Sequence, residues 1–329
     1  MGLFFYFKSI KVHGLKYVKV DQPSLILANH QNALIDALLI ATEWPRFCHF
    51  LTRAAVFKKS IVSKLLGSLN MMPVYRIRDG YSNLSSNNPI FEHCTELLEK
   101  GENIVIFPEG SHNLARRVRP LSKGFTRIVF NTLEKHPEID IQLIPIGFNF
   151  IKATEFGDSV VIKIGAAIHA NHYQKDIRNE AVVNLKKDVH QALTQLTAHI
   201  PEENYNADLK TLESINVDFL DPEQVNKCVS QNFQDCKKSD RKEFKGLKSG
   251  LKILVILNVF VPYIIWKYIV QPKIDEIEFM STFRFTIAIT LVPIYLLLIG
   301  VIIAFSFGLK MAVGYVAIVL ILNLLAVKL

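Results

Sequence analysis

The chain is poor in cysteine, and its cysteines follow no recognisable spacing. No two of them form a C-x-x-C pair, so the sequence offers neither a zinc motif nor a disulfide framework. Cytoplasmic proteins keep their cysteines reduced, and we therefore expect the polar part of the protein to lie in a reducing, cytoplasmic compartment. The cysteines are Cys48, Cys94, Cys228 and Cys236.

Several other sequence signals are missing. No G-x-S-x-G pattern occurs, which argues against a lipase-like serine hydrolase. The N-terminus has no basic segment before its apolar residues and no small-residue cleavage site, so it is not a typical signal peptide. Tyr6 stands where N-myristoylation requires serine or threonine. The chain also contains no internal repeat and no low-complexity tract.

Acidic residues are outnumbered by basic ones. The net charge of +8 favours an anionic partner, such as a phospholipid surface, a nucleic acid or a phosphorylated substrate. No nucleic-acid-binding motif occurs, and we predict no nucleic-acid partner. Half of the residues are apolar, yet 21% are charged. This mixture suggests a polar domain joined to a membrane region.

The longest apolar runs lie in residues 249–329, where we predict two or three transmembrane helices. Each run is about long enough to cross a hydrocarbon core of roughly 30 Å. Pro262 would kink the first run without preventing it from spanning, and Gly308 with Lys310 separates the last two. A buried helical core and a transporter are the alternatives, but the runs carry almost no charge and few polar residues. The runs are 251–270, 283–307 and 311–327.

The charge of the preceding segment predicts the orientation in the membrane. Residues 237–248, KKSDRKEFKGLK, are rich in lysine and arginine, and such segments remain on the cytoplasmic side. We therefore expect an integral protein of a bacterial inner membrane, with its polar domain on the cytoplasmic side. If all three runs span, the C-terminus lies on the opposite side. A re-entrant third segment would change that.

Short apolar strands alternate with helical patterns before this region, which is typical of an α/β domain. We place the domain at residues 13–200. The predicted strands are 24–28, 46–52, 72–76, 103–107, 141–148 and 159–165. The predicted helices are 33–43, 60–68, 87–99, 121–135 and 176–199.

Two further segments flank the domain. Residues 1–12 place several aromatic side chains near Lys8 and Lys11, which predicts an amphipathic helix in the membrane interface. The alternative is that these aromatic residues pack on the core. Residues 201–248 are polar, with one expected helix near 222–236, and form a helical linker to the membrane region.

A histidine and an aspartate stand at the junction between two apolar segments. An apolar strand ends at Asn29 and His30, and Asp36 follows six residues after the histidine. Six residues turn about 240° on a helix, so the two side chains meet only if His30 lies in the loop before it. Asn32 is a suitable N-cap. Asp36 can then orient His30 as a general base, although a structural His–Asp pair is the alternative.

A second polar turn follows the strand that ends at Pro108. Glu109 lies at a strand end, where ligands often bind in α/β sheets. Gly110, followed by Ser111, permits a tight turn whose N–H groups can face an anion. The next residues are basic and predict a phosphate-binding cluster, with a solvated loop as the alternative. They are Arg116, Arg117, Arg119 and Lys123.

Two more strands carry residues of interest. The segment PVYR ends at Arg76, which lies either at a solvated sheet edge or at a binding site. The segment LIPIG, residues 143–147, contains Pro145. Proline within an apolar strand indicates a strand end or an irregularity.

These four segments, in this order and at this spacing, resemble the blocks of the glycerolipid acyltransferase superfamily, which includes the 1-acylglycerol-3-phosphate acyltransferases. The matching parts are His30 with Asp36, PVYR ending at Arg76, FPEGS at 107–111 and LIPIG at 143–147. The resemblance covers roughly residues 10–200. It implies a mixed sheet flanked by helices.

The resemblance also implies a reaction. An acyl group would move from acyl-CoA or acyl carrier protein to 1-acylglycerol-3-phosphate, yielding phosphatidic acid for phospholipid biosynthesis. His30 would be the base and Asp36 its orienting partner. Arg76 and Glu109 would bind the acceptor. Backbone N–H groups near Gly110 and Ser111 would stabilise the oxyanion, and neither a cofactor nor a metal is expected.

Two departures from the family pattern bear on the acceptor. The spacing is His-x5-Asp, one residue longer than the commonest form, and resembles a branch with glycerol-3-phosphate acyltransferases. His112 stands where many members have an arginine tied to the acceptor phosphate. Arg116, Arg117 or Lys123 would then bind that phosphate. Glycerol-3-phosphate, another lysophospholipid and a non-glycerol lipid are the alternative acceptors, and a catalytically silent lipid-binding relative is the alternative to an enzyme.

Overall fold

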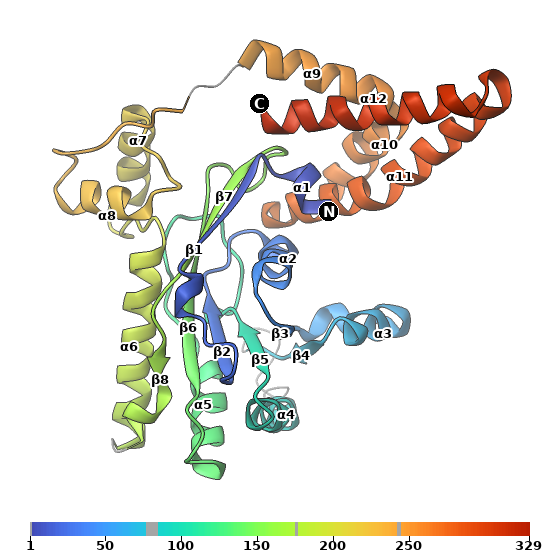
Figure 1. The fold of residues 1–329 in the computed structure, drawn as a ribbon. Helices are drawn as coiled ribbons and strands as arrows, with labels where there is room; N and C mark the ends of the chain where they lie inside the picture. Colours follow the sequence, from blue (N-terminus) through green and yellow to red (C-terminus); the bar gives the residue numbers. More distant parts are fainter. Residues whose placement is uncertain (1, 77–84, 175–176, 242–244) are drawn as a thin grey trace.

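The computed structural model describes residues 2–76, 85–174, 177–241 and 245–329 (Figure 1). Within these ranges, eight strands form one mixed sheet in the order β1-β7-β6-β2-β5-β3-β4, with β8 paired to β6. Strands β6, β2, β5, β3 and β4 are parallel, whereas β7 runs antiparallel to β6. The strands are β1 (Ser9–His13), β2 (Ser24–Ala28), β3 (Cys48–Arg53), β4 (Met71–Val74), β5 (Asn103–Ile106), β6 (Gln142–Phe150), β7 (Ser159–Ile164) and β8 (Ile168–His169).

Helices cover both faces of the sheet, which confirms the predicted fold class. Their bounds are α1 (Gly2–Tyr6), α2 (Ala33–Glu43), α3 (Ser60–Ser68), α4 (Asn88–Glu99), α5 (Gly124–Lys135), α6 (Arg178–Leu196), α7 (Tyr205–Ile215), α8 (Pro222–Ser230), α9 (Lys245–Asn258), α10 (Phe260–Ile264), α11 (Met280–Phe307) and α12 (Leu309–Lys328).

The central strand β2 explains how two cores form around one sheet. Successive side chains of a strand point to opposite faces. Leu25 and Leu27 enter a core with α4, α5 and α6, while Ile26 and Ala28 enter a second core with α2. All five residues of β2 are buried, so the loop that follows this strand leaves from the centre of the domain.

The sequence predicts a strand end or an irregularity at Pro145. The residue lies inside β6, where it pairs with Leu27 of β2, and the irregularity is in the strand on its other side. The other neighbour of β6 changes from β8 to β7 at this point: Leu143 pairs with Ile168 of β8, and Ile146 pairs with Ile164 of β7. The missing N–H of proline therefore falls where the adjacent strand is interrupted.

The N-terminal prediction is wrong in its extent. Only residues 2–6 are helical, and residues 9–13 form β1, a parallel edge strand beside β7. Leu3, Tyr6 and Phe7 are buried in the core, which agrees with the alternative that these residues pack on the core. Phe4 is 55% exposed. The short apolar run packs inward because β1 anchors it to the sheet.

The linker forms a small helical unit with its own core. Helices α7 and α8 pack around Leu212, Val225 and Cys228. The helix expected near 222–236 is α8, which ends earlier, at Ser230, and α7 was not predicted. Cys228 and Cys236 form a disulfide, which contradicts the expectation of no disulfide. The two cysteines are eight residues apart, and the turn after α8 brings them together.

The first apolar run was predicted to form one kinked helix, but it forms two separate helices. Helices α9 and α10 meet at Val259 and are bent by 103°. Pro262 gives the reason, because its ring excludes a helical carbonyl four residues earlier, at Asn258. Within the described part of the chain, two helices are long and apolar enough to cross a membrane, residues 277–307 and 309–328, or three if the bent pair counts as one.

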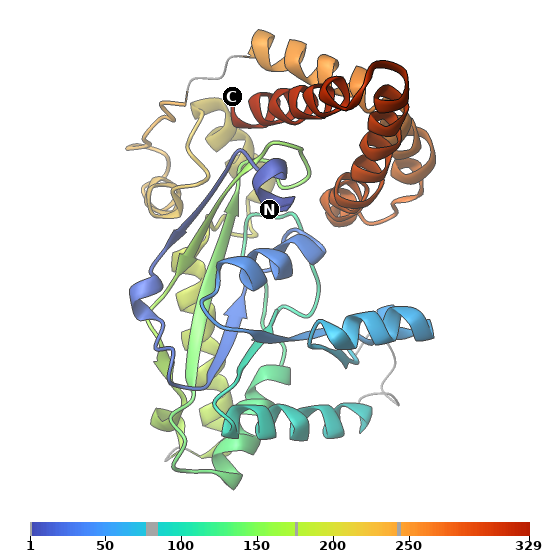
Figure 2. The same ribbon diagram turned by 45° about the vertical axis from the view of Figure 1, so that its right-hand side comes forward.

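Contacts with the domain define how these helices are arranged. Helix α12 packs on α11 and α9, and its end returns to the domain, where Lys8 donates to the carbonyl of Leu329. The bent pair starts near Gly157, which Lys248 approaches, and the segment after it contacts His112 through Glu276. The bent pair α9–α10 and the hairpin of α11 and α12 therefore each begin and end next to the domain (Figures 1 and 2).

Candidate active site

The four sequence blocks converge at one edge of the sheet. Strands β2, β5 and β6 are parallel neighbours, so the loops after their carboxyl ends lie together. Asn29 links β2 to β6 directly, since its side chain donates to the carbonyl of Phe148 and accepts from its N–H, at 3.2 and 2.7 Å. Asn113 N–H donates to the carbonyl of His30 at 2.9 Å, which joins the β2 and β5 loops.

His30 and Asp36 meet as predicted. Nδ1 of His30 lies 2.9 Å from Oδ2 of Asp36, and the side chains are 16% and 0% exposed. Oδ2 also accepts from the N–H groups of Gln31 and Asn32, both at 2.8 Å. Because this oxygen is an acceptor for all three, Nδ1 carries the proton and Nε2 carries the lone pair. A base with that tautomer suits proton abstraction.

The start of α2 differs from the predicted cap. Asn32 is the N-cap residue, but its side chain makes no capping bond and instead donates to the carbonyl of Ala153 at 2.7 Å. Asp36 satisfies the main-chain N–H groups in its place, in the manner of a capping box. Ala33 has a φ of 42°, an unfavourable value for a residue with a Cβ. The carboxylate thus holds a strained turn as well as the histidine.

Phe107 and Glu109 fix the other side of the histidine. The rings of His30 and Phe107 stack with centroids 3.9 Å apart and 13° between planes. Glu109 accepts from the His30 N–H at 3.3 Å and from Nε of Arg119 at 2.6 Å. Arg119 also donates to the side chain and carbonyl of Ser111. The carboxylate of Glu109 is 3% exposed and holds the turn together.

Arg76 and the turn glycine are also in contact. Nη1 of Arg76 donates to the carbonyl of Gly110 at 3.2 Å. Gly110 has a φ of 74°, which favours glycine. Its N–H donates to the carbonyl of Phe107 at 3.0 Å. That N–H therefore closes the turn in this structure, although we had expected it to face an anion.

The three other basic residues named for phosphate binding lie in different surroundings. Arg116 donates to the carbonyls of Phe150 and Ile151 at 2.8 and 2.6 Å and stacks over Phe219. Arg117 pairs with Glu202 at the surface. Lys123 is exposed at the N-cap of α5. Of the four basic residues, Arg76 contacts the turn beside His30, and Arg116 contacts the end of β6 and the residue after it.

His112 is covered by the segment before α11, which the sequence did not associate with the site. Its Nε2 lies 2.5 Å from Oε2 of Glu276. Its ring contacts Phe279 at 4.8 Å and His30 at 5.7 Å between centroids. Residues 249–329 contain only three acidic residues, Asp275, Glu276 and Glu278. That isolated cluster was the signal that could have directed attention to this segment.

Burial changes the pKa values around the turn. It raises the pKa of Glu109, against the opposing effect of the Arg119 guanidinium. Burial, and then the neighbouring His30, lower the pKa of His112, while Glu276 acts in the opposite direction. A neutral His112 adds no positive charge beside the ring of His30.

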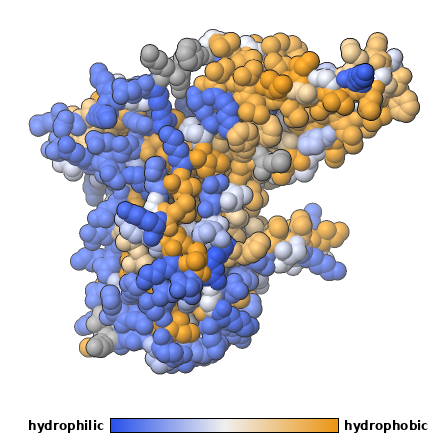
Figure 3. All heavy atoms as spheres, viewed as in Figure 1, coloured by the Kyte–Doolittle hydropathy of each residue, from blue (hydrophilic) through white to orange (hydrophobic). Residues whose placement is uncertain are grey.

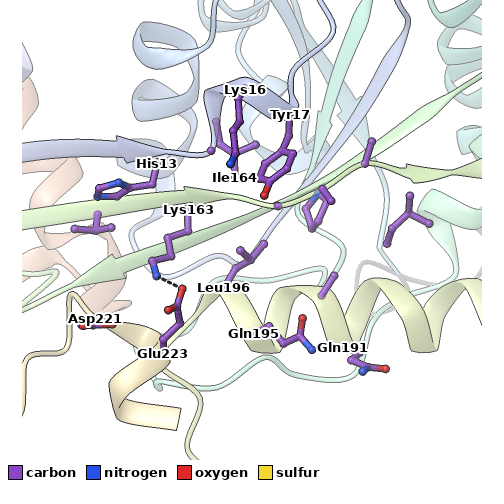
Figure 4. Close-up of a pocket in the computed structure, with 18 of the residues that line it drawn as sticks. His13, Lys16, Tyr17, Lys163, Ile164, Gln191, Gln195, Leu196, Asp221 and Glu223 are labelled. Carbon is purple, nitrogen blue, oxygen red and sulfur yellow. Dashed lines mark hydrogen bonds and ion pairs between the residues drawn. The ribbon is translucent and has the colours of Figure 1, made fainter. Parts of the chain in front are cut away.

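A separate cavity of about 1050 Å³ lies between β1, β7 and α6 (Figure 4). Its charged lining includes the pairs Lys163–Glu223 and Arg241–Asp218, and none of the predicted site residues lines it. Within the part of the chain that the structure describes, no cluster of three His, Cys, Asp or Glu side chains has the arrangement of a metal site.

Comparison with protein families decides the classification of this domain. The family model described as Acyltransferase matches residues 9–149, which include all four blocks. Residues 9–149 of this domain therefore fit the glycerolipid acyltransferase superfamily. The four blocks of this acyltransferase domain therefore lie around the edge of the sheet that holds His30, and the resemblance found in the sequence is confirmed.

Two curated relatives and one solved structure are similar to this chain. Glycerol-3-phosphate O-acyltransferase 1 of Saccharomyces cerevisiae is 25% identical over 33% of this chain and 14% of its own length. The chloroplastic 1-acyl-sn-glycerol-3-phosphate acyltransferase LPAT1 of Arabidopsis thaliana is 25% identical over 38% of this chain and 34% of its own. The crystal structure of the 1-acyl-sn-glycerophosphate acyltransferase PlsC from Thermotoga maritima has a TM-score of 0.36 and 16% identity, over 56% of this chain and 71% of its own. The chain spans about a third or less of the curated relatives it matches.

Proposed function

We propose that this protein transfers a fatty acyl group from a thioester to the free hydroxyl of 1-acylglycerol-3-phosphate. One observation carries the proposal: a partly exposed histidine held 2.9 Å from a fully buried aspartate at the carboxyl edge of a parallel sheet. Acyl-CoA or acyl carrier protein would supply the acyl group. The product would be phosphatidic acid, which places the enzyme in phospholipid biosynthesis.

In the proposed reaction, one proton moves from the acceptor to His30 and then to the leaving group. As the acceptor oxygen attacks the thioester carbonyl, its proton moves to Nε2 of His30. The carboxylate of Asp36 at Nδ1 stabilises the imidazolium that forms. The tetrahedral intermediate then expels the thiolate, which takes the proton back from Nε2. The nucleophile belongs to the substrate, so no residue of the chain needs to be acylated, and the step requires no cofactor.

Arg76 is our candidate for binding the acceptor phosphate. Its guanidinium reaches the carbonyl of Gly110 at 3.2 Å, in the turn whose Glu109 contacts the His30 N–H. A guanidinium presents several donors in one plane, which suits a phosphate. Glu109, which the family resemblance gives as an acceptor ligand, accepts from Nε of Arg119 and from the N–H of His30 in this structure. It would position the turn.

Glycerol-3-phosphate is the second candidate acceptor. The His-x5-Asp spacing resembles a branch with that activity, and one relative is named a glycerol-3-phosphate O-acyltransferase. The lysophosphatidate proposal has similar support from the plant relative. The preference for lysophosphatidate rests on the apolar helices beside the site, since this acceptor resides in the bilayer and glycerol-3-phosphate is soluble.

We further propose that α11 and α12 cross a bacterial inner membrane with the acyltransferase domain on the cytoplasmic side. The basic segment 237–248 supports this side. The disulfide of Cys228 and Cys236 removes the cysteine argument for it, because cytoplasmic proteins rarely keep such bonds. The proposed cytoplasmic side of the domain is therefore supported by the basic segment 237–248 and no longer by the cysteines.

One assay tests the proposal and ranks the acceptors. The purified protein in detergent is offered glycerol-3-phosphate, lysophosphatidate and lysophosphatidylcholine, each with acyl-CoA and with acyl carrier protein. We expect phosphatidic acid from lysophosphatidate. Acylation of glycerol-3-phosphate alone would select the second candidate, and absence of any acylated product with all six combinations would reject the function.

The His30→Ala variant tests the mechanism itself. Loss of the general base should lower kcat by about 10²- to 10⁴-fold without changing the unfolding midpoint. His93→Ala is the matched control, because His93 is an exposed histidine of α4 that pairs only with a surface glutamate among its described contacts. Full activity of the folded His30→Ala protein would show that another group removes the proton.

A further inference from the structure

Helix α3 stands out from the acyltransferase domain and presents apolar side chains on its outer face. In both ribbon views it projects on the same side as the α11–α12 hairpin (Figures 1 and 2). Its inner face packs Leu66 on the core. On its outer face Ile61 is 83% exposed and Leu65 is 59% exposed, and Leu69, just after the helix, is 53% exposed.

The spacing makes these residues one continuous stripe. Residues four apart are neighbours on a helix surface, so Ile61, Leu65 and Leu69 follow one another along α3. A surface helix of a soluble domain normally turns polar residues outward. Helix α3 is apolar on both its inner and its outer face, which indicates that water is not the medium around the outer one.

Basic residues flank the stripe. Lys58 and Lys59 precede the helix, Lys64 lies on it, and all three are exposed. The segment 54–70 contains no acidic residue. Apolar side chains bordered by lysines match the boundary between the acyl chains and the headgroups of an anionic bilayer.

The base of α3 lies at the rim of the active site. Arg53 caps the short helix η2 (Ala54–Phe57) that leads into α3, and its Nη1 is 4.0 Å from Oε1 of Glu276. Glu276 in turn contacts His112. Apolar surface is visible both on α3 and on the C-terminal helices (Figure 3). The rim formed by Arg53, Glu276 and His112 lies between these two apolar surfaces.

We propose that α3 is a second membrane contact, which inserts the stripe of Ile61, Leu65 and Leu69 into the interface of the bilayer that α11 and α12 cross. Its lysines bind anionic lipid headgroups. With the hairpin on one side of the rim and α3 on the other, the domain is held at two points and the edge of the sheet with His30 faces the lipid. A second copy of the chain is a poorer occupant, because the three lysines of each copy would repel one another.

Site-directed spin labelling of the full-length protein tests this proposal. Leu65→Cys and, separately, Ile61→Cys are labelled with a nitroxide; Cys48 and Cys94 are buried and Cys228 is bonded to Cys236. Val183→Cys on α6 is the matched control, since Val183 is 64% exposed and α6 lies on the opposite side of the sheet from α3 (Figure 1). Each protein is placed singly in nanodiscs of phosphatidylcholine with one-third phosphatidylglycerol.

The readout is the accessibility of the nitroxide to oxygen, which concentrates in lipid, relative to a nickel chelate, which stays in water. We expect this ratio to be several-fold higher at positions 61 and 65 than at 183, and to fall when Lys58, Lys59 and Lys64 are changed to Glu. Ratios equal to that at 183 would overturn the proposal. So would dipolar coupling between labels in discs that hold two copies, combined with water-like ratios in discs that hold one. The measurement does not depend on catalysis, so it stands apart from the proposed function.

Discussion

At the scale of single residues, one carboxylate performs two tasks. Asp36 is fully buried, and its Oδ2 accepts from a histidine and from two main-chain N–H groups. Its other oxygen, Oδ1, has no hydrogen-bond partner among the described atoms. The negative charge therefore concentrates on the oxygen next to the base, while the same oxygen fixes the turn that presents the base.

Substitution of Asp36 should separate these tasks. Asp36→Asn keeps an acceptor oxygen for the N–H groups of Gln31 and Asn32 but removes the charge, so we expect kcat to fall by about 10⁴-fold with little change in stability. Asp36→Ala leaves both N–H groups without a partner and should also cost about 2 kcal/mol of unfolding free energy. Denaturant unfolding and initial rates measure the two effects. Equal stability of the two variants would mean that the carboxylate does not hold the turn.

A second prediction concerns Arg76. If it binds the acceptor phosphate, Arg76→Ala should raise KM for the phosphorylated acceptor by about 10- to 100-fold, the value of a charge-assisted hydrogen bond, and change kcat less. Arg127→Ala, an exposed arginine of α5, is the control. A rise of KM in Arg117→Ala or Lys123→Ala, with Arg76→Ala unchanged, would move the phosphate site to the basic loop.

At the scale of elements, most of the site is held by loops, with Asp36 supplied by the first turn of α2. The loop of residues 115–119 is fixed from behind by the segment after α6: His199 Nδ1 accepts from the Val118 N–H at 3.0 Å, and the Ile200 N–H donates to the carbonyl of Arg116 at 2.8 Å. A protonated imidazole could not accept the first of these bonds. The loop that carries Arg119 therefore depends on a neutral histidine.

Acidification should loosen this loop. Burial, and then the neighbouring His190, lower the pKa of His199 below its ordinary value of 6.5. Above pH 6.5 the residue is neutral in the folded and unfolded states alike. As pH falls below 6.5, the unfolded state binds a proton that the folded state does not, so stability is lost. We expect the unfolding midpoint to fall on acidification, and to fall less in His199→Asn, which keeps an acceptor without a titrating ring. An unchanged pH slope in that variant would contradict the assignment.

At the scale of the whole molecule, the segment before the C-terminal helices also covers the candidate site. The family match ends at residue 149, yet Glu276 and Phe279 cover His112. Ser281 and Arg284 bind the carbonyls of Ala153 and Thr154, at 2.7 and 2.8 Å. The C-terminal helices therefore have a defined position relative to His30. If they cross the bilayer as proposed, they would bring a lipid acceptor to this edge of the sheet.

The arrangement of the helices predicts the side of the C-terminus. Lys8 and Lys328 join the chain end to the N-terminal segment, so the C-terminus should lie on the same side of the membrane as the domain. In proteoliposomes, a protease added outside should digest a C-terminal tag and the α7–α8 unit in the same fraction of molecules. A tag inserted at Gly308, between α11 and α12, should report the opposite side. Digestion of the Gly308 tag together with the α7–α8 unit, with the C-terminal tag in the other fraction, would favour three crossings.

Local patterns in the sequence were enough to predict several parts of this protein. Strand β2 and helix α2 begin and end at the predicted residues, because apolar periodicity and turn residues act over a few positions. The same pattern placed His30 in a loop and Asp36 in the first turns of α2, so their contact followed from the chain alone. The order of the four blocks then identified the family.

The partners of the polar groups depend instead on tertiary packing. Arg116 and Arg119 are three residues apart, yet one binds the carbonyls after β6 and the other binds Glu109. Glu276 reaches His112 across 164 residues. The return of the C-terminus to the domain likewise rests on a bend of 103° and on contacts between chain ends. Such choices depend on which segments pack together, and no local pattern encodes that.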